Sequence, residues 1–115
     1  MDSWAWMEYI AGNSRLKAKI ADANLKTPVL VLSEIERALR RKGISESQCV
    51  KILERVCNRS ILLFLDSASA IAAGRIAFEQ GMHLSDAVVY SFASAECPVL
   101  TGDPDFRGKK NVDFL

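Results

Sequence analysis

Apolar residues gather in short runs along the chain, and stretches with helical spacing separate these runs. Two runs, residues 28–32 and 61–65, are rich in aliphatic side chains and have the length of a strand. Residues 98–101 form a third, shorter run, and residues 112–115 have the composition of a fourth. Because these runs lack polar alternation, we expect strands of a parallel sheet that is covered on both faces.

Capping residues and glycines indicate where helices begin and end between the expected strands. Asn13 or Ser14 opens the second helix, Ser33 the third and Ser85 the last, and Ser45 and Gln48 have the spacing of a capping box. The expected helices cover residues 4–11, 16–23, 33–41, 45–57, 66–80 and 85–95. Strands separated by helices predict an α/β sandwich, and 115 residues are enough for one domain, residues 1–115.

Composition excludes several classes of protein. Half of the residues are hydrophobic and a quarter are charged, which excludes a disordered chain. No apolar run approaches the ~18 residues that a membrane span needs, and the N-terminus has no pattern of a secretory signal. Three cysteines are too few for a disulfide framework. We therefore expect a cytoplasmic protein.

The net charge of +1 hides an uneven distribution. Residues 1–60 hold 11 Lys and Arg against 7 Asp and Glu, whereas residues 61–115 hold 4 against 7. The first part therefore carries +4 and the second −3. This pattern is compatible with a basic surface beside an acidic one, and equally with ordinary solvated faces.

Several acidic residues stand where α/β folds place their chemistry, at the carboxyl ends of strands and the starts of helices. Glu34, Asp66, Asp103 and Asp105 follow expected strands, Asp86 opens a helix, and Asp2 precedes the first helix. Carboxylates that meet at one sheet edge repel one another, and a bound Mg²⁺ or Mn²⁺ ion relieves that repulsion. Each acid also has a purely structural explanation, because Asp favours helix caps, first turns and tight turns. The residues alone leave both explanations open.

The C-terminal part resembles the signature of the PIN-domain family. The likeness is carried by Ser85-Asp86-Ala87, which opens a helix, and by Thr101-Gly102-Asp103-Pro104-Asp105-Phe106, which follows a strand. Asp2-Ser3-Trp4 and Leu32-Ser33-Glu34 resemble two earlier segments of the family, in the same order. The small VapC-like ribonucleases of toxin–antitoxin pairs are the most similar in style.

The resemblance implies a metal-dependent ribonuclease and sorts the acidic residues. Asp2, Glu34, Asp86 and Asp103 match the catalytic positions that hold Mg²⁺ or Mn²⁺, whereas Asp66 matches none and is interpreted as a helix cap. Asp105, Thr101 and Ser3 match supporting positions. The expected RNA-binding residues flank this site, and they are Arg37, Arg40, Arg41, Lys42, Arg107 and Lys109. Cations at helix ends also favour the helix dipole, which is the alternative reading of the first group.

The resemblance further implies a three-layer sandwich in which a central strand precedes the first aspartate. Only Met1 precedes Asp2 in this sequence, so we expect the first central strand to be missing or truncated. The expected partners are an RNA substrate, a cognate antitoxin protein and a second copy of the chain. Two alternatives stay open, a housekeeping RNA-processing nuclease and a truncated, non-catalytic PIN-like binding module. Trp4 and Trp6 are expected in the core or a dimer contact, and His83 in a structural role.

Overall fold

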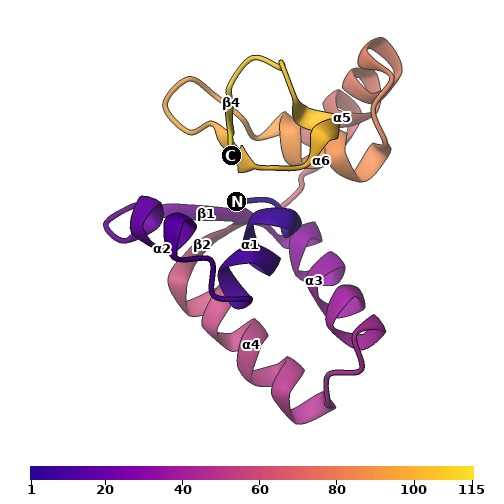
Figure 1. Cartoon of the computed structure of the whole chain (residues 1–115). Helices are drawn as coiled ribbons and strands as arrows, with labels where there is room; N and C mark the ends of the chain where they lie inside the picture. Colours follow the sequence, from indigo (N-terminus) through magenta and orange to yellow (C-terminus); the bar gives the residue numbers. More distant parts are fainter.

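A computed structural model describes residues 1–115 as an α/β chain of six helices and four short strands. Figure 1 follows these elements from the N-terminus to the C-terminus. In chain order they are α1 (Ser3–Ile10), α2 (Ser14–Ile20), β1 (Leu25–Pro28), α3 (Val29–Arg41), α4 (Glu46–Arg59), β2 (Ser60–Leu63), α5 (Ser67–Gln80), α6 (Leu84–Ser91), β3 (Val99–Thr101), the 3-10 turn η1 (Pro104–Phe106) and β4 (Val112–Phe114). The α/β class and the parallel pairing agree with the sequence, but the strands form two separate pairs instead of one sheet.

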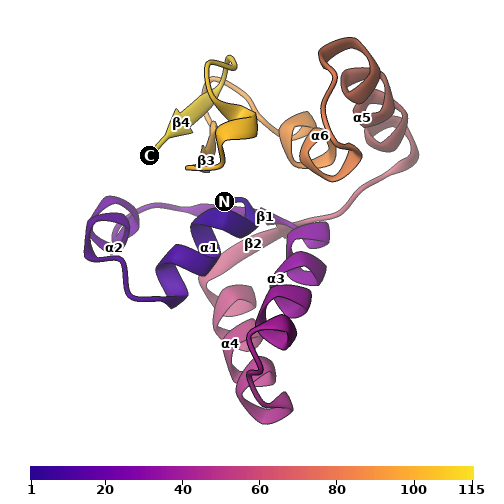
Figure 2. The same ribbon diagram turned by 45° about the vertical axis from the view of Figure 1, so that its right-hand side comes forward.

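Both strand pairs are parallel. β1 lies beside β2 with Leu25 opposite Ser60, and β3 lies beside β4 with Val99 opposite Val112. The N-terminus lies between the two pairs (Figure 2). There the Met1 amino group donates to the Lys26 carbonyl at 2.7 Å in β1, and the Asp2 amide donates to the Leu100 carbonyl at 3.5 Å in β3. Met1 and Asp2 therefore join the two pairs with one hydrogen bond to each.

The open edge of β3 faces these N-terminal residues. Val99 donates its amide to Asn111 and Thr101 accepts from Leu115, so both residues bond on the β4 side. Alternate residues of a strand bond on opposite edges, so Leu100 bonds on the side away from β4. On that side the Leu100 carbonyl accepts the hydrogen bond from the Asp2 amide, and no strand lies there.

The expected strand at residues 28–32 is wrong, because the helix α3 begins there. Pro28 ends β1 with ψ near 137°, and Val29 already belongs to the helix, so Ser33 lies inside α3 and caps nothing. Val31, Ile35 and Leu39 are all buried and recur every four residues along one face of α3. Glu34 consequently projects from the second turn of a helix instead of following a strand.

Three further expectations need correction. The run at 61–65 forms a strand only over Ser60–Leu63 and is not buried, since Ile61 is 58% and Phe64 is 74% exposed. The last helix begins one residue before Ser85, with His83 as an N-cap that makes no side-chain bond, and it ends at Ser91 instead of 95. The second helix ends at Ile20 instead of 23.

One cluster of buried apolar side chains connects the elements around both strand pairs. Trp6 from α1 and Ile35 from α3 lie in it together with Val99 and Leu100 of β3 and Phe106 of the 3-10 turn. The indole Nε1 of Trp6 donates to the buried Thr27 hydroxyl at 3.0 Å, which satisfies both polar groups inside the core. The expectation of a core position for Trp6 is thus confirmed.

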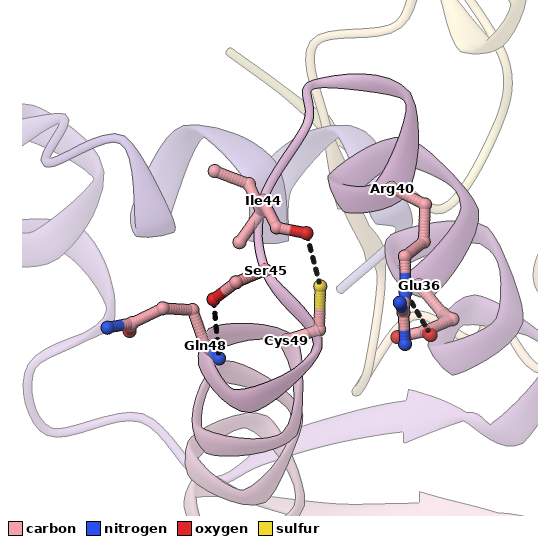
Figure 3. A network of polar contacts seen from close by, with 6 residues as sticks. All are labelled: Glu36, Arg40, Ile44, Ser45, Gln48 and Cys49. Atoms are coloured by element: carbon pink, nitrogen blue, oxygen red, sulfur yellow. Dashed lines mark hydrogen bonds and ion pairs between the residues drawn. The ribbon is translucent and has the colours of Figure 1, made fainter.

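Local capping bonds explain why α4 and α5 begin where they do. Ser45 accepts from the Gln48 amide at the start of α4, beside the Cys49 thiol, which donates to the Ile44 carbonyl (Figure 3). Asp66 accepts from the Ser69 amide at 2.8 Å at the start of α5, which confirms its interpretation as a cap. None of the helices combines the length and the apolar character that crossing a membrane requires.

Candidate metal centre

Three aspartates from two distant parts of the chain meet at one point. Asp86 lies in the first turn of α6, and Asp103 and Asp105 lie at and just after the N-cap of the 3-10 turn that follows β3. One carboxylate oxygen from each lies within 4.8 Å of the others. Asp105, which the sequence places in a supporting role, therefore stands in the same group as Asp86 and Asp103.

The local backbone explains the position of Asp103 and Asp105. Pro104 occupies the first position of the 3-10 turn, and the Asp103 carboxylate accepts from the Asp105 amide at 3.0 Å. This side-chain cap fixes the two acidic residues relative to each other. Phe106, which ends the turn, is buried and anchors it to the core.

Asp2 reaches the same end of β3 through Thr101. The buried Thr101 hydroxyl donates to one carboxylate oxygen of Asp2 at 2.5 Å and accepts from the Asp103 amide at 2.9 Å. The other oxygen of Asp2 caps α1 by accepting from the Ala5 amide at 2.9 Å. Asp2 is only 4% exposed, and burial raises its pKa to about 6, which the bond from Thr101 partly offsets. Thr101 therefore orients both Asp2 and the loop that carries Asp103.

Glu34 lies close enough to the other acids for their charges to affect its pKa. Burial raises its pKa, and the charges of Asp86 and Asp2 raise it further, whereas Arg37 and the neighbouring Ser3 hydroxyl act in the opposite direction. Asp86 is half-buried, and its pKa is raised by burial and by the charges of Asp103 and Asp105. The acids of this region thus hinder one another's ionisation, which is the condition that a bound cation relieves.

A cavity of about 480 Å³ brings acidic and basic side chains together on one side of Asp103. Glu34 and Asp103 line it together with Arg37, Arg41 and Lys42, which come from the end of α3 and the residue after it. Three of the expected RNA-binding cations therefore border the same space as two of the expected metal-holding acids. Ser3 lines this cavity as well.

The other expected cations lie elsewhere. Arg40 is paired with Glu36 at 2.9 Å on an exposed side of α3, as Figure 3 shows, and it does not line the cavity. Arg107 lies over the Phe114 ring at 4.6 Å. Lys109 donates to Gln80 at 3.0 Å and borders a second cavity, of about 120 Å³, together with Asp86 and Asp105.

Two residues that sequence reasoning did not place in the site lie beside it. His83 lines the smaller cavity, and its charge opposes the rise in the pKa of Asp86 that burial and the neighbouring aspartates cause. Trp4 lines the larger cavity and packs against Gly102, where an added Cβ would lie 2.4 Å from the ring. His83 and Asp86 are three residues apart across a helix start, and this spacing could have indicated that His83 lies near Asp86. Nothing in the sequence indicates that Trp4 packs against Gly102.

The donor set fits a hard divalent cation. Asp86, Asp103 and Asp105 offer only carboxylate oxygens, which Mg²⁺ and Mn²⁺ prefer, and no histidine or cysteine belongs to the group. Glu34 and Asp2 lie outside this group of three but are coupled to it through their charges. Asp86, Asp103 and Asp105 would therefore hold the ion directly.

Known proteins provide no further guide to this site, since no family model, curated protein or solved structure matches the chain.

Proposed function

We propose that this chain is a metal-dependent ribonuclease of the PIN-domain type, acting as the toxin of a toxin–antitoxin pair. The observation that carries the proposal is the meeting of Asp86, Asp103 and Asp105 within 4.8 Å, beside the cavity that Glu34 shares with Arg37 and Arg41. A phosphodiester needs both features, because carboxylates alone would repel its negative charge.

The residues have distinct tasks in this proposal. A Mg²⁺ or Mn²⁺ ion at the aspartates would supply positive charge to the scissile phosphate and lower the pKa of a bound water. Arg37, Arg41 and Lys42 bind neighbouring phosphates of the RNA and hold the chain along the cavity. Glu34, at the border between the two groups, accepts a proton from the attacking water, a task that its raised pKa suits.

The test is a cleavage assay on a fluorogenic single-stranded RNA with Mg²⁺ or Mn²⁺ and with EDTA. We expect cleavage only with metal, and a loss of at least a hundredfold in Asp103→Asn and Asp86→Asn, since each removes a ligand charge. Asp22→Asn, at an exposed acid away from the site, is the matched control. Cleavage that persists in EDTA, or at the wild-type rate in Asp103→Asn, would refute the proposal.

Metal binding is measured separately from activity. Mn²⁺ should raise the melting temperature of the wild-type protein and of Asp22→Asn, but not that of Asp86→Asn. If Mn²⁺ stabilises the protein and no RNA is cleaved, the chain is a metal-binding PIN-like module without catalysis.

We also propose that a strand position of a three-layer, PIN-like sandwich lies between β1 and β3. The supporting observations are the two detached parallel pairs, the open edge at Leu100 and the hydrogen bonds that Met1 and Asp2 make to both sides. Five Val or Ile residues added before Met1 should raise the free energy of unfolding by pairing with both edges. Five Gly or Ser residues at the same place are the control, and equal stability of the two proteins would contradict this part.

The proposed partners are a second copy of the chain and an antitoxin protein. A partner surface is supported by the exposed apolar side chains between residues 61 and 84, above all Phe78 at 89% and Ile71 at 66% on α5. Light scattering should show a dimer that Phe78→Glu converts to a monomer, whereas a wild-type monomer would contradict the dimer. Inhibition of cleavage by the product of a neighbouring gene tests the antitoxin.

A further inference from the structure

A third cavity, of about 420 Å³, lies on a different face of α1 from the acidic site. Helices α1, α2 and α4 enclose it, and these three helices surround one region of the ribbon in Figure 1. Its volume lies within the range of small-molecule pockets, about 300–1,000 Å³. None of the acids of the candidate metal centre lines it.

Three cations border this cavity and no acidic side chain does. They are Lys17 from α2 and Arg55 and Arg59 from α4. The two ion pairs of the molecule join Lys19 to Asp113 and Arg40 to Glu36, so all three cations lack a carboxylate partner. The cavity thus concentrates positive charge that no protein group neutralises, and an anion would gain from all three charges.

Arg59 is held in place without losing its charge. Its guanidinium donates to the Ile20 carbonyl at 2.6 Å, at the end of α2, and to the Ala23 carbonyl at 3.1 Å, in the connection that follows. These acceptors are neutral, so the bonds fix the side chain and leave its full positive charge at the cavity. The fixed guanidinium reduces the ordering cost that an anion would otherwise meet on binding.

Apolar side chains make up the rest of the lining. Tyr9, Ile10 and Ile52 contribute to it above the buried Trp6. Trp6 and Tyr9 meet edge to face with ring centroids 5.6 Å apart, which positions the Tyr9 ring. The Lys17 ammonium lies over that ring, 5.8 Å from its centroid, so the cation stands on one face of Tyr9.

We propose that this cavity binds a nucleoside monophosphate. The planar base packs on the aliphatic side chains of Ile10 and Ile52 beside Tyr9, and the phosphate binds Lys17 and Arg55, with Arg59 adding to the positive field. A free inorganic anion would leave the apolar lining unused, and an uncharged nucleoside would leave the cations unpaired. The inference is independent of the proposed nuclease, since it uses neither the acids nor a metal.

The probes are AMP and UMP, titrated by calorimetry in EDTA, with adenosine and inorganic phosphate as comparison ligands. We expect saturable one-to-one binding of at least one nucleotide, at least tenfold tighter than adenosine or phosphate. Lys17→Gln and Arg55→Gln, both at exposed positions where folding is not at stake, should each weaken it at least tenfold. Lys51→Gln, an exposed cation of α4 that does not line the cavity, should leave the dissociation constant unchanged.

Any one of the following results would overturn the proposal. Neither nucleotide binds at millimolar concentration, or binding survives both Lys17→Gln and Arg55→Gln, or an acidic peptide such as hexaglutamate binds there more tightly than the nucleotides. The last result would assign the cavity to a protein partner. Asp103→Asn should bind nucleotide like the wild type, and loss of binding in that variant would move the ligand to the acidic site instead.

Discussion

The buried carboxyl group of Asp2 makes the stability of the metal-free protein depend on pH in a direction that the structure fixes. Asp2 has an ordinary pKa of 3.8 in the unfolded chain and a pKa of about 6 in the fold, chiefly because burial disfavours its charge. Between these values the folded protein holds a proton that the unfolded chain has released. The free energy of unfolding therefore falls as the pH rises from about 4 to about 6.

The size of the effect follows from the two pKa values. The pKa rises from 3.8 to about 6, and each tenfold change in acidity corresponds to about 1.4 kcal/mol, so ionised Asp2 costs about 3 kcal/mol. Asp2→Asn removes this dependence, because an amide does not titrate. The variant also loses one of two acceptor oxygens that serve Ala5 and Thr101, but this loss adds an offset that does not change with pH.

The assay is urea unfolding in EDTA, followed by tryptophan fluorescence, at several values between pH 3.5 and pH 7.5. The difference in unfolding free energy between wild type and Asp2→Asn should shift by about 3 kcal/mol across this range, in favour of the variant at high pH. Asp66→Asn is the control with the opposite sign. The cap bond from Ser69 lowers the pKa of Asp66, so its contribution is present at neutral pH and is lost as the pH falls. A wild-type-minus-variant difference for Asp2 that stays constant with pH would refute the reasoning.

Three substitutions test the packing and the helix capping of the fold. Gly102→Ala places a Cβ against the Trp4 ring and should lower the free energy of unfolding in urea by about 1–3 kcal/mol. The loss should be smaller in a Trp4→Leu background, and an unchanged stability would mean that Trp4 moves freely. Ser45→Ala removes the cap of α4 and should lower the unfolding free energy by about 1 kcal/mol, measured in the same way. Trp6→Phe leaves the buried Thr27 hydroxyl without its donor and should cost about 3 kcal/mol or more by thermal melting, part of which Thr27→Val should restore.

The sequence predicted best those elements whose ends carry their own chemistry. The side chains of Ser45 and Asp66 accept hydrogen bonds from backbone amides in the first turns of α4 and α5. Gly81 ends α5 in the left-handed conformation. These signals are local, because each depends on residues within one turn of the helix end. The strand β3, at residues 99–101, was also found, since Pro98 and Gly102 bound its apolar run.

The first turn of α3 was assigned to a strand, and only residues 33–41 to a helix, because a short apolar run fits two periods. Four consecutive apolar residues after Pro28 satisfy a buried strand and the first turn of a helix equally well. Only the continuation of the burial from Val31 to Ile35 and Leu39 distinguishes the two, and it depends on what packs against the face. The exposure of Ile61 and Phe64 was not predicted for a different reason: an apolar run does not show that β2 pairs only with β1 and ends at Leu63.

The acidic residues of the site were all selected from the sequence, but their grouping was not. Asp105 lies beside Asp86 and Asp103 because residues 104–106 form a 3-10 turn. Pro104 indicates a turn in the sequence but does not determine which way the Asp105 side chain faces. The positions of Trp4 and His83 depend on how α1 and α6 approach the loop after β3. Contacts between segments that are distant in the sequence produce no periodic pattern of residues, so they cannot be predicted from it.

The hydrogen bond from the Met1 amino group to Lys26 has a practical consequence for anyone who purifies this protein. The ammonium lies next to Asp2, and its charge favours the ionised carboxylate. An affinity tag or protease scar fused to this end replaces the ammonium by a neutral amide, which should raise the pKa of Asp2 further and alter the field at the aspartates. A C-terminal tag leaves that amine free, so proteins tagged at the two ends should differ in the pKa of Asp2.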